Sequence, residues 1–149
     1  MLIKNLLEEN KRRKDEMYKR FNPRTGEGSI GERELLYLPD FPIKTQYITK
    51  AMCRKKLIVK LREYGSVENF LLSYLHVDPD DIEEEKEKVV RRFVKLRCEH
   101  DFPFWCILFV IIKDKESGES IHFKLNYPQR ILVSEYERQR LENIPIRLI

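Results

Sequence analysis

The last third of the chain changes from an alternating hydrophobic pattern to a helical one. Ile121, Phe123 and Leu125 alternate with polar residues, which predicts a strand with these three side chains on its inner face. Asn126 follows as a helix N-cap, because its side-chain oxygen can accept from the free amides of a first turn. Pro128 suits that turn because it has no N–H to lose. The pattern therefore predicts a strand that leads directly into a helix.

The predicted helix continues to Asn143, and Pro145 prevents it from going further. Residues 144–149 are largely apolar, and we expect them to be extended and to form a short strand. The hydrophobic positions that recur near helical spacing are Ile131, Leu132, Tyr136 and Leu141.

Upstream of the alternating stretch, the pattern predicts another helix and a hairpin. Asp101 is an N-cap and Pro103 occupies the first turn. The hydrophobic side chains of residues 102–110 are expected to be buried almost all round. Residues 110–112 favour a strand, and Gly118 allows the hairpin turn that follows because it can take a positive φ.

The middle of the chain contains three predicted helices. Asp78 caps the longest, in which acidic residues lie near the N-terminus and basic residues, including Arg97, lie near the C-terminus, as the helix dipole favours. Two shorter helices meet at Gly65 and Ser66, and their spacing alone resembles a helix-turn-helix. The second has few side chains able to read a major groove, so packing in the core is the better interpretation. The predicted core positions are Leu57, Ile58, Leu61, Val67, Phe70, Leu71, Leu75, Ile82, Val89, Phe93 and Leu96.

The segment before these helices is predicted to be extended. Pro39 and Pro42 exclude a helix from residues 35–47 and restrict the residues before them. We expect this segment to wrap the surface of the domain. Its apolar anchors would be Leu36, Leu38, Phe41, Ile43 and Tyr47.

Two N-terminal features invite a phosphate-binding interpretation. Residues 26–31 read Gly-x-Gly-x-x-Gly, but no hydrophobic strand precedes them, so a turn is the simpler interpretation. A predicted helix within residues 1–21 has a basic second half, which either contacts DNA phosphates or forms a solvated face with its interleaved acids. The candidate phosphate contacts are Lys11, Arg12, Arg13, Lys14 and Arg20.

The amino-acid composition excludes few classes of binding partner. The net charge of +4 permits an acidic partner such as nucleic acid without requiring one. Three cysteines without a Cys-x-x-Cys spacing fit a reducing cytoplasm. Cys98, His100 and Cys106 could supply three metal ligands, but a fourth is missing, so no metal site is predicted. No apolar run approaches the ~20 residues that span a bilayer, so no membrane partner is expected.

The C-terminal part of the sequence resembles a known family. The run Phe123-Lys124-Leu125-Asn126, then Gln129, the helix and residues 144–149 look like the segment before the Walker A phosphate loop in large terminase subunits of tailed phages and prophages. The similarity also covers residues 105–118 and, more loosely, 22–27 and 31–33. The resemblance implies the N-terminal region of a DNA-packaging ATPase, ending just before that loop.

The resemblance also implies an adenine contact at the start of the last helix. A glutamine amide can bond to N6 and N7 of adenine, and an aromatic ring can stack on the base. The residues implied in this contact are Gln129, Tyr127, Phe123 and Asn126. The intact protein would use ATP and Mg²⁺. The 149 residues contain no Gly-x-x-x-x-Gly-Lys-[Ser/Thr] loop, so we expect this chain to be catalytically incomplete and to bind neither ligand tightly.

By the same resemblance, the intact motor moves double-stranded DNA into a capsid in the bacterial cytoplasm, with a small terminase subunit and a portal as partners. The isolated chain would be able to form a homodimer through the edge of its last strand. The alternative belongs to a different class: a free-standing helical interaction module or weak DNA-binding protein that uses the basic N-terminal arm.

We therefore expect an α+β fold, predominantly helical, with a small β-hairpin and a C-terminal strand that would enter an α/β ATPase sheet. The expected divisions are a basic helical arm (1–21), a loop and extended segment (22–48), a helical subdomain (49–100), and a hairpin with the start of the ATPase domain (101–149).

Overall fold

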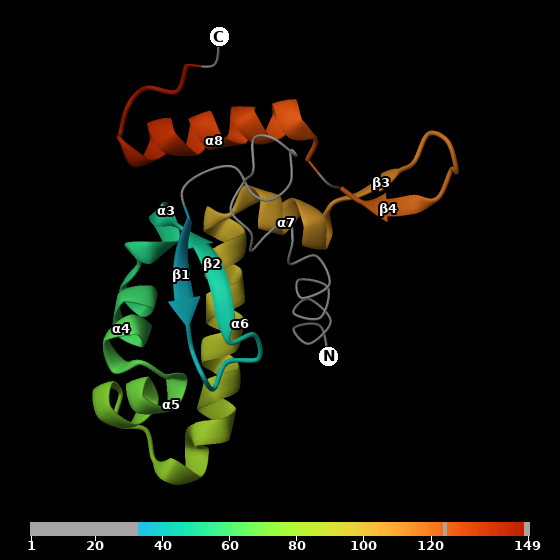
Figure 1. Cartoon of the computed structure of the whole chain (residues 1–149). Coiled ribbons are helices and arrows are strands. Elements are labelled where there is room, and N and C mark those ends of the chain that lie inside the picture. The colour runs from blue at the N-terminus through green and yellow to red at the C-terminus, as the bar shows by residue number, and fades with distance from the viewer. Residues whose placement is uncertain (1–32, 124, 148–149) are drawn as a thin grey trace.

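The computed structural model of the chain describes residues 33–123 and 125–147. Its long helix α6 lies beside a β-hairpin and two short helices, α8 lies across one end of this body, and a second hairpin projects from it (Figure 1). The elements are β1 (Arg33–Tyr37), β2 (Thr45–Thr49), α3 (Lys50–Cys53), α4 (Lys56–Tyr64), α5 (Val67–Asn69), a π-helical turn (Phe70–Tyr74), a 3-10 turn (Pro79–Asp81), α6 (Ile82–His100), α7 (Phe102–Phe109), β3 (Ile111–Lys113), β4 (Ser120–His122) and α8 (Tyr127–Leu141).

The fold is mixed, with helices and two antiparallel two-stranded sheets in the described part of the chain. The predicted α+β class with predominant helix is confirmed at this level. Neither small sheet contains residues 144–147, so the C-terminal strand and its place in an ATPase sheet stay a prediction.

Strands β1 and β2 correct the prediction of an extended segment that wraps the surface. They pair antiparallel, with Arg33 opposite Thr49 and Tyr37 opposite Thr45. Pro39 lies in the connecting loop, so it blocks no ladder hydrogen bond. The apolar side chains that were predicted to anchor this segment do pack in or against the core, with Leu36, Leu38 and Phe41 buried and Ile43 and Tyr47 partly buried.

The core lies between this hairpin, α4 and α6. Phe41 and Phe93 meet with ring centroids 4.7 Å apart, which joins the hairpin loop to α6. All the predicted core positions of the middle helices are buried or pack against the core, except Leu75, which is exposed. Leu75 follows the π-helical turn, whose wider spacing rotates it away from the core face of a regular helix.

The predicted turn between α4 and α5 is confirmed. Gly65 ends α4 with a φ of 75°, a left-handed conformation that favours glycine. Ser66 then caps α5 by accepting from the amide of Asn69. Asp40, in the hairpin loop, accepts from the next two amides, those of Val67 and Glu68, at 2.9 and 2.8 Å. The start of α5 is therefore fixed by a local cap and by a carboxylate from a distant segment.

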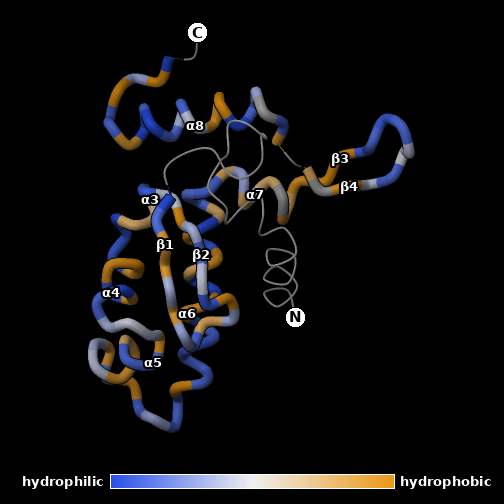
Figure 2. The backbone as a smooth tube through the Cα atoms, viewed as in Figure 1, coloured by the Kyte–Doolittle hydropathy of each residue, from blue (hydrophilic) through white to orange (hydrophobic). Residues whose placement is uncertain are grey.

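Helix α7 corrects a second prediction. Asp101 caps it as expected, accepting from the amide of Phe104, but the helix is not buried all round. Phe102, Trp105 and Phe109 are 42%, 40% and 44% exposed. Figure 2 shows that hydrophobic residues continue from α7 into β3. In β3, Ile111 is 61% exposed, and Ile121 of β4, predicted to face inward, is 42% exposed, whereas Leu125 is buried.

Candidate functional site

The start of α8 is a capping box formed by two of the predicted adenine-contact residues. Asn126 Oδ1 accepts from the backbone amide of Gln129 at 3.0 Å. In return, Gln129 Oε1 accepts from the backbone amide of Asn126 at 2.9 Å. These reciprocal bonds satisfy two amide donors that a helix start leaves free. The N-cap prediction for Asn126 is confirmed, and the spacing Asn-x-x-Gln has a structural role of its own.

The capping box fixes the orientation of the Gln129 carboxamide but leaves part of its hydrogen-bonding capacity free. Oε1 has a second lone pair, and Nε2 carries two hydrogens. Gln129 is half-buried and Asn126 is exposed, so a ligand can reach these two side chains at the start of α8. An acceptor and a donor on one rigid planar group can meet the N6 and N7 edge of adenine. This arrangement is compatible with the predicted contact and gives it an orientation.

The structure describes the remaining predicted adenine-contact and DNA-contact residues only in part. Phe123 is half-buried, and its backbone amide donates to Val110 O at 2.7 Å, which ties the segment after β4 to the residue that follows α7. The side chain of Tyr127 lies outside the described part of the chain. The candidate DNA contacts Lys11, Arg12, Arg13, Lys14 and Arg20 also lie outside it.

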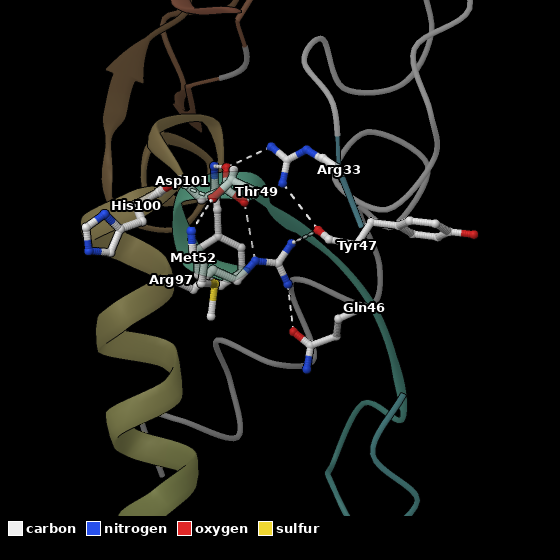
Figure 3. A network of polar contacts seen from close by, with 9 residues as sticks. Arg33, Gln46, Tyr47, Thr49, Met52, Arg97, His100 and Asp101 are labelled. Carbon is white, nitrogen blue, oxygen red and sulfur yellow. Dashed lines mark hydrogen bonds and ion pairs between the residues drawn. The ribbon is translucent and has the colours of Figure 1, made fainter. Parts of the chain in front are cut away.

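Sequence reasoning missed a buried charged network below α8, drawn in Figure 3. Arg97 is 0% exposed and Asp101 is 1% exposed, and their side chains meet at 3.3 Å. Arg33 makes two bonds to the same carboxylate, at 2.6 and 2.9 Å. Arg97 also donates to Gln46 Oε1 at 2.7 Å and to Tyr47 O at 3.3 Å. The network therefore joins β1, β2 and the junction of α6 with α7.

The two guanidinium groups keep Asp101 ionised. Burial alone raises the pKa of Asp101, but the charges and hydrogen bonds of Arg33 and the charge of Arg97 hold it below its ordinary value. The guanidinium of Arg97 also lies 4.3 Å from the ring centroid of Phe104, a cation–π contact. A carboxylate held in this state does not exchange protons near neutral pH, so the network is suited to structure and not to acid–base catalysis.

The sequence signal for this network was ambiguous. Arg97 near a helix C-terminus and Asp101 at an N-cap are each explained by local helix rules. Arg97 lies in the last turn of α6, as predicted, but the helix rules do not show that its side chain is buried. Its four-residue separation from Asp101 was the one available hint.

Polar contacts join the network to α8 at His100. Thr49 Oγ1 donates to His100 O at 2.8 Å, which ties β2 to the end of α6. Arg140 Nη2 lies 3.0 Å from His100 Nδ1. Burial lowers the pKa of His100, and the nearby charges of Lys55 and Arg140 lower it further, so the neutral ring can accept from Arg140.

A cavity of about 540 Å³ separates α8 from the body. Two buried polar atoms, Arg33 Nε and Glu137 Oε2, have no hydrogen-bond partner among the residues that the structure describes, although Glu137 Oε2 lies 3.7 Å from Arg140 Nε. Arg33 and Glu137 line this cavity. Helix α8 therefore rests on the body through a few polar contacts, such as that of Arg140 with His100, and leaves room beneath it.

Three further findings concern metal ligands, membrane spans and similarity to known proteins. Within residues 33–123 and 125–147, no three His, Cys, Asp or Glu side chains gather closely enough to hold a metal ion. None of the helices described there combines the length and hydrophobicity that a membrane span requires. In comparisons with known proteins, the chain matches no family model, no curated protein and no solved structure.

Proposed function

We propose that this chain is the N-terminal region of a DNA-packaging ATPase of the large-terminase type, and that the start of α8 contacts the adenine of ATP. In the intact protein, ATP with Mg²⁺ would drive double-stranded DNA into a capsid in the bacterial cytoplasm. A small terminase subunit and a portal would be its partners. The chain itself would be catalytically incomplete, because most ATP affinity comes from groups around the phosphates.

The observation that carries the proposal is the capping box of Asn126 and Gln129. Reading adenine requires an acceptor for N6–H and a donor for N7, in one plane. The Gln129 carboxamide offers both, and its bond to the Asn126 amide holds it in one rotamer before any ligand arrives. Preorganisation of this kind reduces the entropy lost on binding.

The distribution of exposed hydrophobic side chains gives independent support. Eleven of the fifteen large exposed apolar residues in the described part of the chain lie after residue 101. Exposed apolar surface marks regions that another part of the protein or a partner covers. The eleven residues are Phe102, Trp105, Phe109, Ile111, Ile112, Ile121, Ile131, Leu132, Tyr136, Ile144 and Ile146.

The alternative, a free-standing helical interaction module or weak DNA-binding protein, depends on the basic arm of residues 11–24. Its test is duplex DNA binding as a function of salt. Binding that falls steeply with salt and disappears when Lys11, Arg12, Arg13 and Lys14 are changed to Ala would support it. Absence of binding at low salt would remove it.

The first experiment on the proposal is to read the source DNA beyond codon 149. An in-frame phosphate loop such as Gly-x-x-x-x-Gly-Lys-[Ser/Thr], or a basic variant of it, would support a packaging ATPase. A stop codon with no such loop would overturn the proposal.

The second experiment separates the capping role of Gln129 from nucleotide recognition. Gln129→Glu keeps an oxygen that can accept from the Asn126 amide, but its ionised carboxylate cannot donate to N7. In the longer protein, we expect Gln129→Glu to keep its stability and to lose the preference for ATP over GTP, by roughly 10–100-fold in kcat/KM. An unchanged preference would mean that Gln129 acts only as a cap.

A further inference from the structure

The exposed side of α7 is an aromatic stripe. Phe102, Trp105 and Phe109 are separated by three and four residues, so they lie on one face of the helix. Phe102 and Trp105 stack, with ring centroids 5.9 Å apart. A stripe that remains exposed on a hydrophobic helix is a common mark of a protein contact.

Helix α6 faces this stripe with charged residues. A cavity of about 390 Å³ lies between the two helices, lined by Arg91, Val94, Lys95, Cys98, Trp105 and Phe109. A second cavity, of about 360 Å³, also includes Cys98 and continues to Phe102 and to Tyr136 of α8. We call the two adjoining cavities the α6–α7 groove. It has aromatic side chains along α7 and cations at the end formed by Arg91 and Lys95.

The cations at this end are available to a partner. Lys95 makes no hydrogen bond or ion pair with any other residue that the structure describes, and neither does the neighbouring Arg92. Arg91 pairs with Glu87 at 2.6 Å, but both side chains are well exposed, so the pair contributes little and can be exchanged. Unpaired cations beside an apolar groove complement an acidic and apolar ligand.

We propose that the α6–α7 groove is a docking site for an amphipathic helix of a partner protein, with apolar residues on one face and acidic residues along the edge nearest Arg91 and Lys95. The aromatic stripe runs along α7 from Phe102 to Phe109, about two helical turns, which is the length over which a bound helix presents its i, i+3, i+4 and i+7 anchors. This proposal does not rest on the proposed ATPase function.

A helix fits the groove better than single-stranded nucleic acid does. Phe102 and Trp105 stack on each other, which occupies one face of each ring that a base would need. Glu99, Glu137 and Arg140 line the α8 end of the groove, and Arg140 lies 3.7 Å from Glu137, so this end offers phosphates no excess of positive charge. Acidic residues of a helix can be confined to the other end, whereas phosphates run the full length of a strand.

Fluorescence of Trp105 can report binding at the groove, because Trp105 is the only tryptophan of the chain. The probe is a synthetic helical peptide of about 18 residues with leucines on one face and glutamates along one edge. The control peptide has lysine in place of each glutamate. We expect the acidic peptide to change Trp105 emission saturably, with an affinity that falls as salt is raised, and the basic peptide to have no effect.

Matched variants locate the contact. Lys95→Glu should weaken acidic-peptide binding by about tenfold or more, whereas Lys115→Glu, the same charge change in the turn between β3 and β4, should leave it within about twofold. Phe109→Ser should weaken binding measured by the anisotropy of a labelled peptide. Circular dichroism of each variant checks that the fold is retained.

Four outcomes would overturn the proposal. Equal binding of the two peptides would show nonspecific apolar contact. Displacement of the acidic peptide by an oligothymidine strand would assign the groove to nucleic acid. Self-association of the chain that buries Trp105 would assign the groove to a second copy. A change in Trp105 emission on Leu6→Asp with Leu7→Asp, without any peptide, would assign it to the chain's own N-terminal residues.

Discussion

The carboxamide of Gln139 makes both hydrogen bonds of a β-ladder with the backbone of Arg147. Its Oε1 accepts from the Arg147 amide at 2.7 Å, and its Nε2 donates to the Arg147 carbonyl at 3.0 Å. A side chain near the end of α8 thus takes the place of a neighbouring strand. The segment after Asn143, which turns with a φ of 54°, is therefore tied to its own helix.

Changing Gln139 to Leu should release this segment. Leu keeps most of the side-chain volume but offers no hydrogen bond, so the amide of Arg147 should exchange with solvent about tenfold faster, for a loss of roughly 1.4 kcal/mol of local stability. Hydrogen exchange followed by NMR measures this directly. Glu142→Ala, on the same helix, is the control that should leave the exchange rate of Arg147 unchanged. Equal protection of Arg147 in the Leu variant would mean that other contacts hold the segment.

Changing Asp101 to Asn should destabilise the body strongly. Asn can still cap α7, but it leaves Arg33 and Arg97 buried without a negative charge. Breaking a buried ion pair from one side costs about 3–5 kcal/mol. Urea unfolding followed by circular dichroism should show a loss of this size, and a loss below about 1 kcal/mol would mean that the network contributes little.

A surface ion pair supplies the comparison for Asp101. Arg62 and Glu34 meet at 2.7 Å, but both side chains are partly solvated. Arg62→Ala should therefore cost no more than about 1 kcal/mol. The two variants test whether burial, and not the short distance, makes the Asp101 contact important.

The ionisation of Asp101 predicts how stability changes in acid. Its pKa is lowered in the folded protein, so its contribution is fully present above the unfolded value of 3.8 and is lost as the pH falls from there through the folded value. The gap in unfolding free energy between the wild type and Asp101→Asn should be constant from pH 7 to about 5 and shrink below about 4. Urea unfolding at several pH values measures it. A gap that grows in acid would contradict the direction of the pKa shift.

The half-buried thiols of Cys53 and Cys98 should react slowly near neutral pH. Burial raises the pKa of each thiol to about 11, and the charge of Glu34 adds to the shift at Cys53. Since the thiolate is the reactive form, alkylation by iodoacetamide in the folded protein should be well below the rate of an unfolded control at pH 8 and rise steeply toward pH 10. Mass spectrometry of each cysteine measures the rates. A fast reaction at pH 8 would mean that the side chain is more solvated than the structure indicates.

Features set by neighbouring residues could be predicted from the sequence. Ser66, Asp78, Asp101 and Asn126 were all expected to begin helices, and each accepts from an amide of a first turn. Gly118 was expected in the second hairpin turn and has a φ of 71° there. Caps and turns depend on a few adjacent groups, so one sequence contains the information.

Features set by distant residues could not be predicted. The pairing of β1 with β2 depends on what covers the hairpin, and the prolines of its loop suggested an unpaired segment. The hydrophobic run of α7 does not say which of its sides is covered, so the exposure of Trp105 was missed. In the candidate site, the cap at Asn126 was expected, but the return bond from Gln129 was not, although a Gln at the third helical position is a known signal for it.

The ion pair of Arg33 with Asp101 also constrains how the chain folds. Its partners are 68 residues apart, whereas Arg97 and Asp101 are separated by four. The second pair can form as soon as α6 ends, while the first must wait for closure of a long loop, which costs conformational entropy before it brings any contact. We therefore expect the helix junction to be an early folding event and the docking of β1 to be the late, rate-limiting one.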